Sequence, residues 1–333
     1  MDTPILAVDL GATNLRFALV AADGAVLTRS RRGTKGQEGA ARTLEKIHEG
    51  IAEMLDEARR GVRGIGIGSP GPLDSRRGVV LETPNIPGWR NIKLKALVEK
   101  RFGLPCKVEN DANCAALAEH WVGAGRGVCD MLHYTLGTGI GGGAIVNGRL
   151  VQGKDFAGGE LGHVTVEPDG LICGCGNPGC IEAYASATGI VRRFEARLRA
   201  GEASVLLEDC RAGRTPITAR AIQEAAKQGD DLAQKIIRET GRYLGIAVAS
   251  MVSVFNPSVV SFSGGVARFG RALFDPMRAE VRRRAFGSMT RGLRMVRSRL
   301  GDNAGVIGAA RALMLELKNL AAPRRGLRRK SRS

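Results

Sequence analysis

ILAVDLGATNLRFALV (residues 5–20) and MLHYTLGTGIGGGAIV (residues 131–146) are two versions of one pattern. Each version predicts a strand, a glycine-containing turn and a second strand, and a hairpin turn at Asp23-Gly24 or Asn147-Gly148 leads on to a third strand. The repeat predicts two related α/β domains with a cleft between them. Shifted by 126 residues without a gap, the two segments are identical at Leu6/Leu132, Leu10/Leu136, Gly11/Gly137, Ala18/Ala144 and Val20/Val146.

The glycine-rich turn of the second version matches a dinucleotide-binding motif only by its letters. Gly137-x-Gly139-x-x-Gly142 has the spacing, but that motif must open a helix whose N-terminus meets the pyrophosphate. The next residues, AIVNGRLV, are typical of a strand and a hairpin, so a Rossmann site is rejected. The Gly-Lys-Ser/Thr of a P-loop does not occur in the sequence either.

A glycine-rich turn between two strands can still bind phosphate, because side chains do not cover its backbone N–H groups. Thr13, Asn14 and Thr138 add hydroxyl and amide donors. Taken singly, each turn is more typical of an ordinary tight hairpin. Its repetition favours two loops that hold the phosphates of a nucleotide.

The composition excludes a disordered chain, a collagen and a disulfide-stapled miniprotein, since 44% of the 333 residues are hydrophobic. The formal net charge of +17 lies mostly in two stretches. Residues 271–299 contain nine arginines with Asp275 and Glu280, and residues 318–332 contain seven basic residues and no acid. We expect residues 323–333 to be a disordered basic tail, because a like-charged block repels itself. No aromatic residue interleaves its arginines, so nucleic acid is only a minor alternative as a partner.

The start of the chain, MDTPILAVDLGATN, lacks the features of a secretory signal. The longest apolar stretch, residues 243–255, is too short to cross a bilayer. We therefore expect a cytoplasmic protein without a membrane partner. Seven cysteines in such a chain are more typical of thiols and metal ligands than of disulfides.

Three of these cysteines lie close together in CGCGNPGC, ten residues after His163. Glycines and Pro178 allow this segment to fold back, so that soft thiolates converge with an imidazole. Four protein ligands leave no open position for an activated water, which predicts a structural Zn²⁺ site. Its predicted ligands are His163, Cys173, Cys175 and Cys180.

Hydrophobic periodicity predicts further elements outside the repeat. We expect helices at residues 39–60, 112–121, 218–228, 231–255 and 305–320, and strands beginning at residue 64 and spanning 106–109 and 259–262.

These motifs resemble the ROK family of bacterial sugar kinases and related repressors, and within it the glucokinases. The resemblance covers residues 5–310, through AVDLGATNLRF, SPGPLD, TPNIPGW, ENDAN, LGTGIGGG, GGELGHV, CGCGNPGCIEAYAS and SGGV in the family's order. It implies the two-domain actin-like/hexokinase (ribonuclease H-like) α/β fold with an interdomain cleft. The implied domains are residues 1–111 with about 302–320, and residues 112–301.

The resemblance also implies a role for individual residues. Asp111 matches the catalytic base that takes the proton of the sugar's 6-hydroxyl, although its local pattern is also that of an N-cap for a helix starting at Ala112. Asp9 matches the carboxylate that acts through Mg²⁺. The implied sugar-binding residues are Asn85, Asn110, Asp111, Glu160, His163 and Glu182. The implied ATP-binding residues are Asp9, Gly11, Thr13, Asn14, Gly137, Thr138, Gly139, Gly264 and Gly265.

The implied activity is that of an ATP-dependent glucokinase of glycolysis, acting as a homodimer or homotetramer. The sequence leaves open N-acetylglucosamine, N-acetylmannosamine or another hexose as the acceptor, and polyphosphate as the donor. A sugar-responsive regulator is a further alternative. The family's repressors carry a helix-turn-helix domain ahead of the first phosphate loop, whereas here that loop begins by Asp9.

Overall fold

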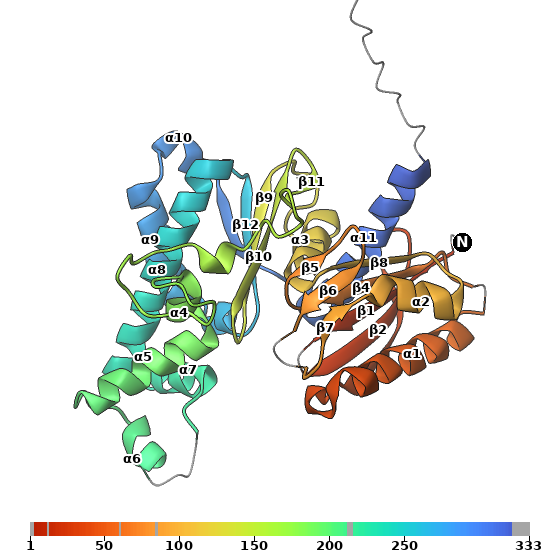
Figure 1. The fold of residues 1–333 in the computed structure, drawn as a ribbon. Coiled ribbons are helices and arrows are strands. Elements are labelled where there is room, and N and C mark those ends of the chain that lie inside the picture. Colours follow the sequence, from red (N-terminus) through yellow and green to blue (C-terminus); the bar gives the residue numbers. More distant parts are fainter. Residues whose placement is uncertain (1–2, 12, 60, 84–85, 212–215, 322–333) are drawn as a thin grey trace, which may run out of the picture. The chain divides into compact units, whose positions relative to one another are not determined.

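The computed structural model describes residues 3–11, 13–59, 61–83, 86–211 and 216–321. The chain divides into two compact units (Figure 1). The first unit comprises Met1–Asp111 and Ala309–Ser333, and the second comprises Ala112–Gly308. The second unit thus extends to Gly308 rather than to residue 301, because the start of the last helix packs on this unit: a Cβ at Gly308 would lie 1.7 Å from the carbonyl oxygen of Cys114.

The first unit is built on a five-stranded sheet. Its central strand β1 (Ile5–Leu10) is buried at every residue, as a continuous apolar run predicts for a strand covered on both faces. β1 pairs antiparallel with β2 (Asn14–Val20) and parallel with β4 (Ile65–Ser69). A second, three-stranded sheet contains β5 (Leu73–Asp74), β6 (Val79–Glu82) and β7 (Arg90–Ile92). The five-stranded sheet has the order β3 (Val26–Gly33), β2 (Asn14–Val20), β1 (Ile5–Leu10), β4 (Ile65–Ser69) and β8 (Cys106–Asn110).

Helices pack on this sheet at positions where small residues leave room. In α1 (Gly39–Glu57) the buried residues recur at helical spacing, and Gly50 lies against the ring of Phe17. Helix α11 (Ala304–Ala321) crosses β4 at Gly66, where a Cβ would lie 2.1 Å from the carbonyl oxygen of Ala309. The remaining helices of this unit are η1 (Gly36–Glu38) and α2 (Leu94–Phe102).

The second unit repeats the five-stranded sheet of the first. Its strands β9 (Met131–Leu136) and β10 (Ile140–Val146) have the bounds of β1 and β2 shifted by the 126 residues of the sequence repeat. β9 pairs antiparallel with β10 and parallel with β12 (Val259–Ser263), as β1 does with β2 and β4. The repeat therefore corresponds to one folding pattern used twice. The strand order is β11 (Arg149–Leu150), β10 (Ile140–Val146), β9 (Met131–Leu136), β12 (Val259–Ser263) and β13 (Arg294–Arg297).

The long helix α8 (Asp231–Phe255) organises the apolar core of the second unit. It begins after Asp230, whose carboxylate accepts a hydrogen bond from the backbone N–H of Ala233 at 2.7 Å, and it ends at the left-handed Asn256. The other helices are α3 (Asp111–Trp121), η2 (Leu161–His163), α4 (Ile181–Ala185), α5 (Ala187–Arg199), α6 (Leu206–Arg211), α7 (Ala219–Lys227), η3 (Val266–Phe269), α9 (Arg271–Arg284), α10 (Gly287–Thr290) and η4 (Gly301–Asn303).

All the helices and strands expected outside the repeat are present, with small shifts of their ends. One shift concerns a predicted site residue. Asp111 is the first residue of α3 rather than a cap that precedes a helix starting at Ala112. Within the described residues, no helix is both long and apolar enough to cross a membrane.

Candidate functional site

The glycine-rich loop between β9 and β10 is held by the start of α5. The carbonyl oxygen of Gly137 accepts a hydrogen bond from the backbone N–H of Ala187 at 2.9 Å, and that of Thr138 accepts one from the hydroxyl of Thr188 at 3.0 Å. Neither the N–H of Thr138 nor that of Gly139 donates a hydrogen bond to a residue that the structure describes. The loop's carbonyls are thus engaged while two N–H groups remain available to an anion.

A second turn of the same unit follows β12 and packs directly on the end of β9. Gly264 has a φ of 89°, and a Cβ there would lie 2.2 Å from the carbonyl oxygen of Leu136. Only glycine fits this position. Gly265 directly precedes η3, and the space around its own Cβ position is open.

A buried polar ladder joins the two strands beneath these turns. His133 of β9 is fully buried, and its two ring nitrogens lie 2.8 Å from the hydroxyl of Ser261 and 3.0 Å from that of Ser263 on β12. Ser263 in turn donates to the hydroxyl of Thr135 at 3.4 Å. Burial lowers the pKa of His133 to about 3, so the imidazole is neutral.

The corresponding turn of the first unit lies between β1 and β2. Its ends are tied by a hydrogen bond of 3.0 Å from the N–H of Gly11 to the carbonyl oxygen of Asn14, and Thr34 donates its hydroxyl to the carbonyl oxygen of Gly11 at 2.7 Å. Asp9, nearly buried at the end of β1, pairs with Arg16 at 3.0 Å. Thr13 is exposed.

Asn110 and Asp111 lie where β8 ends and α3 begins. The side-chain amide of Asn110 reaches the carbonyl oxygen of Gly71 at 3.4 Å, and its backbone N–H donates to the buried Glu109 at 3.0 Å. Glu109 also accepts a hydrogen bond of 2.7 Å from Ser75. This network fixes the strand end that presents Asp111. Asn85 lies outside the described residues.

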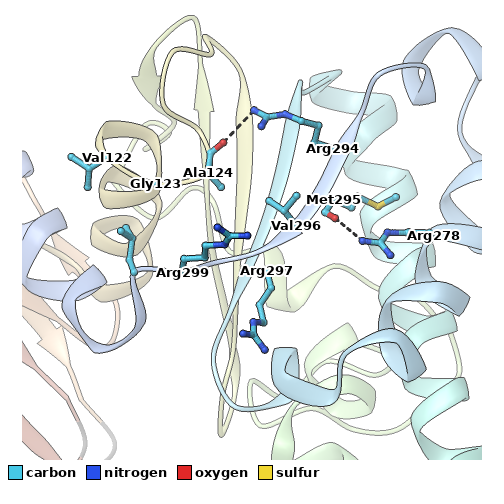
Figure 2. Close-up of a pocket in the computed structure, with 10 residues that line it drawn as sticks. Val122, Gly123, Ala124, Arg278, Arg294, Met295, Val296, Arg297 and Arg299 are labelled. Carbon is cyan, nitrogen blue, oxygen red and sulfur yellow. Dashed lines mark hydrogen bonds between the residues drawn. The ribbon is translucent and has the colours of Figure 1, made fainter.

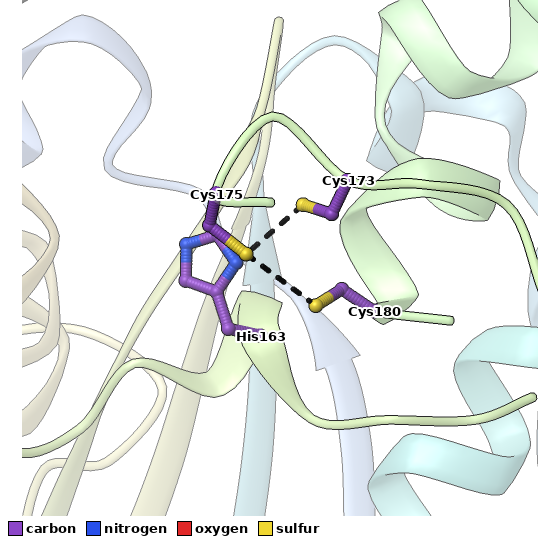
Figure 3. A group of neighbouring side chains, drawn as sticks. All are labelled: His163, Cys173, Cys175 and Cys180. Carbon is purple, nitrogen blue, oxygen red and sulfur yellow. Dashed lines mark hydrogen bonds between the residues drawn. The ribbon is translucent and has the colours of Figure 1, made fainter. Parts of the chain in front are cut away.

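In the second unit, the four predicted zinc ligands converge (Figure 3). The ligand atoms of His163, Cys173, Cys175 and Cys180 all lie within 4.8 Å of one another. Cys175 Sγ is 3.7 Å from Cys180 Sγ, and Cys173 Sγ is 3.7 Å from His163 Nδ1. A tetrahedron with Zn–S bonds of about 2.3 Å has edges of about 3.8 Å, so these donors fit a tetrahedral metal such as Zn²⁺.

The surroundings of the three thiols shift their pKa values in different directions. Burial raises the pKa of the Cys173 thiol to about 12 and also raises that of Cys180. A backbone hydrogen bond from Asn177 lowers the pKa of Cys175, the exposed member of the three. A metal ion in this cluster would hold the thiols as thiolates, since metal ligation displaces their protons.

Glu182 connects this cluster with the glycine-rich loop of the second unit. One carboxylate oxygen accepts a hydrogen bond of 2.8 Å from the backbone N–H of Ile140, directly after the loop, and the other lies 3.5 Å from Cys173 Sγ. A Cβ at Gly139 would lie 2.5 Å from the first of these oxygens. The glycine therefore gives the carboxylate access to the loop. Glu160 is exposed and directly precedes η2, which carries His163.

A sequence model of the ROK family matches residues 5–316. The chain belongs to the ROK family. The glucokinase of Thermotoga maritima is 41% identical over 309 residues, which are 92% of this chain and 96% of that protein. The xylose repressor of Caldicellulosiruptor bescii is 31% identical over 91% of this chain and 76% of its own length.

A solved structure of the ROK family extends the likeness to three dimensions. The crystal structure of a ROK family glucokinase from Streptomyces griseus in complex with glucose and AMPPNP matches with a TM-score of 0.77 and 38% identity. The match covers 92% of this chain and 98% of that chain. The fold of this ROK chain is thus the expected actin-like α/β fold.

The sequence analysis did not identify the residues that hold the predicted site residues and loops in place. Arg16 could have been found, because a tight hairpin places it opposite Asp9, as the observed register does. His133 also lies on a predicted strand, but its partners Ser261 and Ser263 are more than a hundred residues away. The ROK motifs contain no signal for that pairing.

Proposed function

We propose that the protein is an ATP-dependent glucokinase that phosphorylates the 6-hydroxyl of D-glucose. The observation that carries the proposal is the likeness, over nearly the whole chain, to a ROK glucokinase solved with glucose and AMPPNP. The Thermotoga maritima glucokinase supports the same substrate class.

Asp111 is the general base of the proposed reaction. It takes the proton of the 6-hydroxyl while that oxygen forms a bond to the γ-phosphorus of ATP, and the bond from this phosphorus to the β–γ bridging oxygen breaks. The products are glucose 6-phosphate and ADP. Such a transfer depends mainly on positioning and charge neutralisation.

The two glycine-rich loops hold the phosphates in this proposal. The free N–H groups of Thr138 and Gly139 supply donors on one side, and Gly11, Thr13 and Asn14 supply the other. Gly137 completes the second loop, while Gly264 and Gly265 form the turn for the adenosine. Asp9 is the carboxylate that would hold Mg²⁺, which neutralises phosphate charge.

Asn110, Glu160, His163 and Glu182 bind the sugar hydroxyls, together with Asn85. Carboxylate, amide and imidazole groups suit this task because they bind hydroxyl groups directionally. Zn²⁺ held by His163 and the three cysteines would stabilise the loop that carries these residues, without taking part in the reaction. His163 faces the cluster with Nδ1, which leaves Nε2 for the sugar.

Replacement of Asp111 by Asn tests the assigned base. We expect kcat for glucose phosphorylation to fall by about 10² to 10⁴, while the dissociation constant for ATP stays the same. Asp56→Asn, at an exposed position of α1, is the matched control and should leave kcat unchanged. Undiminished turnover by the folded Asp111→Asn protein would refute the assignment.

A panel of hexoses and donors tests the substrates. Coupled assays with glucose, N-acetylglucosamine and N-acetylmannosamine, each with ATP or polyphosphate, should give the highest kcat/KM for glucose with ATP. A higher kcat/KM for an N-acetylated sugar would assign that sugar as the acceptor in place of glucose. The assignment of the protein as a sugar kinase would stand. Light scattering during gel filtration should show the proposed homodimer or homotetramer.

The repressor relative supports a second candidate, a sugar-responsive regulator. It predicts sugar binding without turnover on any sugar of the panel, together with salt-sensitive DNA binding. Phosphorylation of glucose at a rate typical of an enzyme would exclude it.

A further inference from the structure

The arginines of residues 271–299 separate into two sets in the structure. Helix α9 contains both acids of this stretch, and each is engaged by arginines of the same helix. Strand β13 and the two residues after it, which end the stretch, contain arginines but no acid. On α9, Asp275 pairs with Arg271 and Arg278, and the buried Glu280 pairs with Arg283 and Arg284.

The second set surrounds a cavity of about 640 Å³ in the second unit (Figure 2). Arg294, Arg297 and Arg299 line it together with Arg278. Its other lining residues are glycine or apolar, so the wall contains neither an acidic nor an aromatic side chain among the described residues. This arginine pocket, defined by the four arginines, includes none of the residues assigned to ATP or to the sugar.

Two of the four guanidinium groups are fixed by backbone carbonyls, and of these two only Arg278 also has an acid as a partner. Arg294 donates to the carbonyl oxygen of Ala124 at 3.2 Å, and Arg278 donates to that of Met295 at 3.0 Å. Arg297 and Arg299 are exposed and make no ion pair or hydrogen bond with any residue in the described part of the chain. Much of the pocket's positive charge is therefore uncompensated.

Two carboxylates lie near the pocket, but neither pairs with Arg294, Arg297 or Arg299. Asp275 lies 3.4 Å from Arg278, but it also pairs with Arg271. Glu119 is buried and already accepts hydrogen bonds from the hydroxyl of Ser298 and from the N–H of Ala124. Arg294, Arg297 and Arg299 have no carboxylate partner among the described residues.

Protection of a sheet edge explains only part of this arrangement. β13 is an edge strand, and charged side chains on such a strand discourage pairing with another chain. Exposed arginines alone would serve that purpose. They would not require a cavity with two guanidinium groups held in place on its wall.

We propose that the arginine pocket binds a small anion that carries two or more phosphate groups. Guanidinium groups match phosphate oxygens in geometry and in charge. Arg294 and Arg297 lie three residues apart on a strand, which is about 10 Å of backbone, so an anion with several phosphate groups can contact both more readily than a single phosphate can. The cavity has the size of a small-molecule site, and without an aromatic wall it recognises phosphates rather than a base.

Binding of inorganic tripolyphosphate to the full chain tests the proposal. Saturating AMPPNP and Mg²⁺ keep the nucleotide site occupied, and excess free Mg²⁺ is held constant. We expect tripolyphosphate to slow backbone hydrogen exchange in the peptide that covers residues 291–300. Orthophosphate should require a concentration at least about tenfold higher, because it makes fewer charge-assisted hydrogen bonds.

The variant Arg297→Gln/Arg299→Gln should lose this protection and weaken tripolyphosphate binding to the protein at least about tenfold, while the kcat for glucose stays unchanged. Arg282→Gln/Arg291→Gln is the matched control, since it removes the same charge from exposed positions of the same unit outside the pocket. Circular dichroism establishes that both variants fold.

Three results would overturn the proposal. The first is unchanged exchange in residues 291–300 of the wild type. The second is equal weakening of binding in both double variants, which would indicate attraction by net charge alone. The third is a short DNA duplex that protects residues 291–300 at lower concentration than tripolyphosphate does, which would assign the surface to nucleic acid.

Discussion

At the scale of single residues, Glu182 has two structural tasks. Its carboxylate accepts the N–H of Ile140 beside the glycine-rich loop, and it also lies next to Cys173 of the metal cluster. The carboxylate that we propose for sugar binding is thus placed by the same contact that fixes the end of the proposed phosphate loop. This contact offers a route by which sugar and nucleotide can influence each other's binding.

Two substitutions separate these tasks. Glu182→Ala removes the acceptor for Ile140, whereas Glu182→Gln keeps a carbonyl oxygen there and removes only the charge. We expect the KM for glucose to rise in both variants. The KM for ATP should rise about fivefold in the alanine variant only, the equivalent of one lost hydrogen bond. An equal KM for ATP in the alanine variant and the wild type would show that the contact does not position the loop.

His133 makes the stability of the protein depend on pH. Its folded-state pKa of about 3 lies below the unfolded value of about 6.5, so below pH 6.5 the unfolded chain binds a proton that the folded chain does not. Stability is therefore full above pH 6.5 and is lost as the pH falls towards 3. The contribution amounts to about 2 kcal/mol between pH 7 and pH 5.

Urea unfolding of the wild type and of His133→Asn at pH 7 and pH 5 measures this contribution. The variant is expected to be less stable at pH 7 but to lose less unfolding free energy on acidification. Parallel losses in the two proteins would mean that other groups cause the pH dependence.

At the scale of elements, the sequence predicted those features that short segments encode. The hairpins and α8 follow from local spacing and were found with small errors at their ends, and the convergence of the one histidine and three cysteines also follows from local spacing. Contacts such as Glu182 with Ile140 join residues that are far apart in the chain and have no local pattern. The arginine pocket was visible in the sequence only as an excess of charge, because sequence does not show which arginines the two acids engage.

The loop with the metal cluster supplies a prediction at this scale. Cys175→Ser should reduce bound zinc from one equivalent per chain to less, and should raise the KM for glucose because Glu182 and His163 lose their support. Metal content by emission spectroscopy and steady-state kinetics measure the two effects. Cys129→Ser, an exposed cysteine outside the cluster, is the control. Full zinc content with normal kinetics in the Cys175→Ser protein would contradict the assignment.

At the scale of the whole molecule, the net charge of +17 has at least two sources with different consequences. Four of the five arginines of α9 pair with its two acids, whereas the arginines of β13 line a pocket and have no acid partner among the described residues. The basic tail beginning at Pro323 lies outside the described residues, and it contains none of the residues assigned to the reaction. We therefore expect catalysis to be independent of the tail.

Two truncations test this expectation: one removes only the tail, and the other also removes the end of α11. A chain ending at Ala322 keeps all of α11 and should retain kcat/KM for glucose within about twofold, with an unchanged Tm. A chain ending at Leu315 also loses Glu316, which pairs with Lys95 at 2.8 Å and Lys107 at 3.1 Å. Loss of these two part-buried ion pairs and of the last six residues of α11 should lower the free energy of unfolding by at least about 1 kcal/mol. If the folded protein ending at Ala322 lacked activity, the tail would belong to the catalytic machinery.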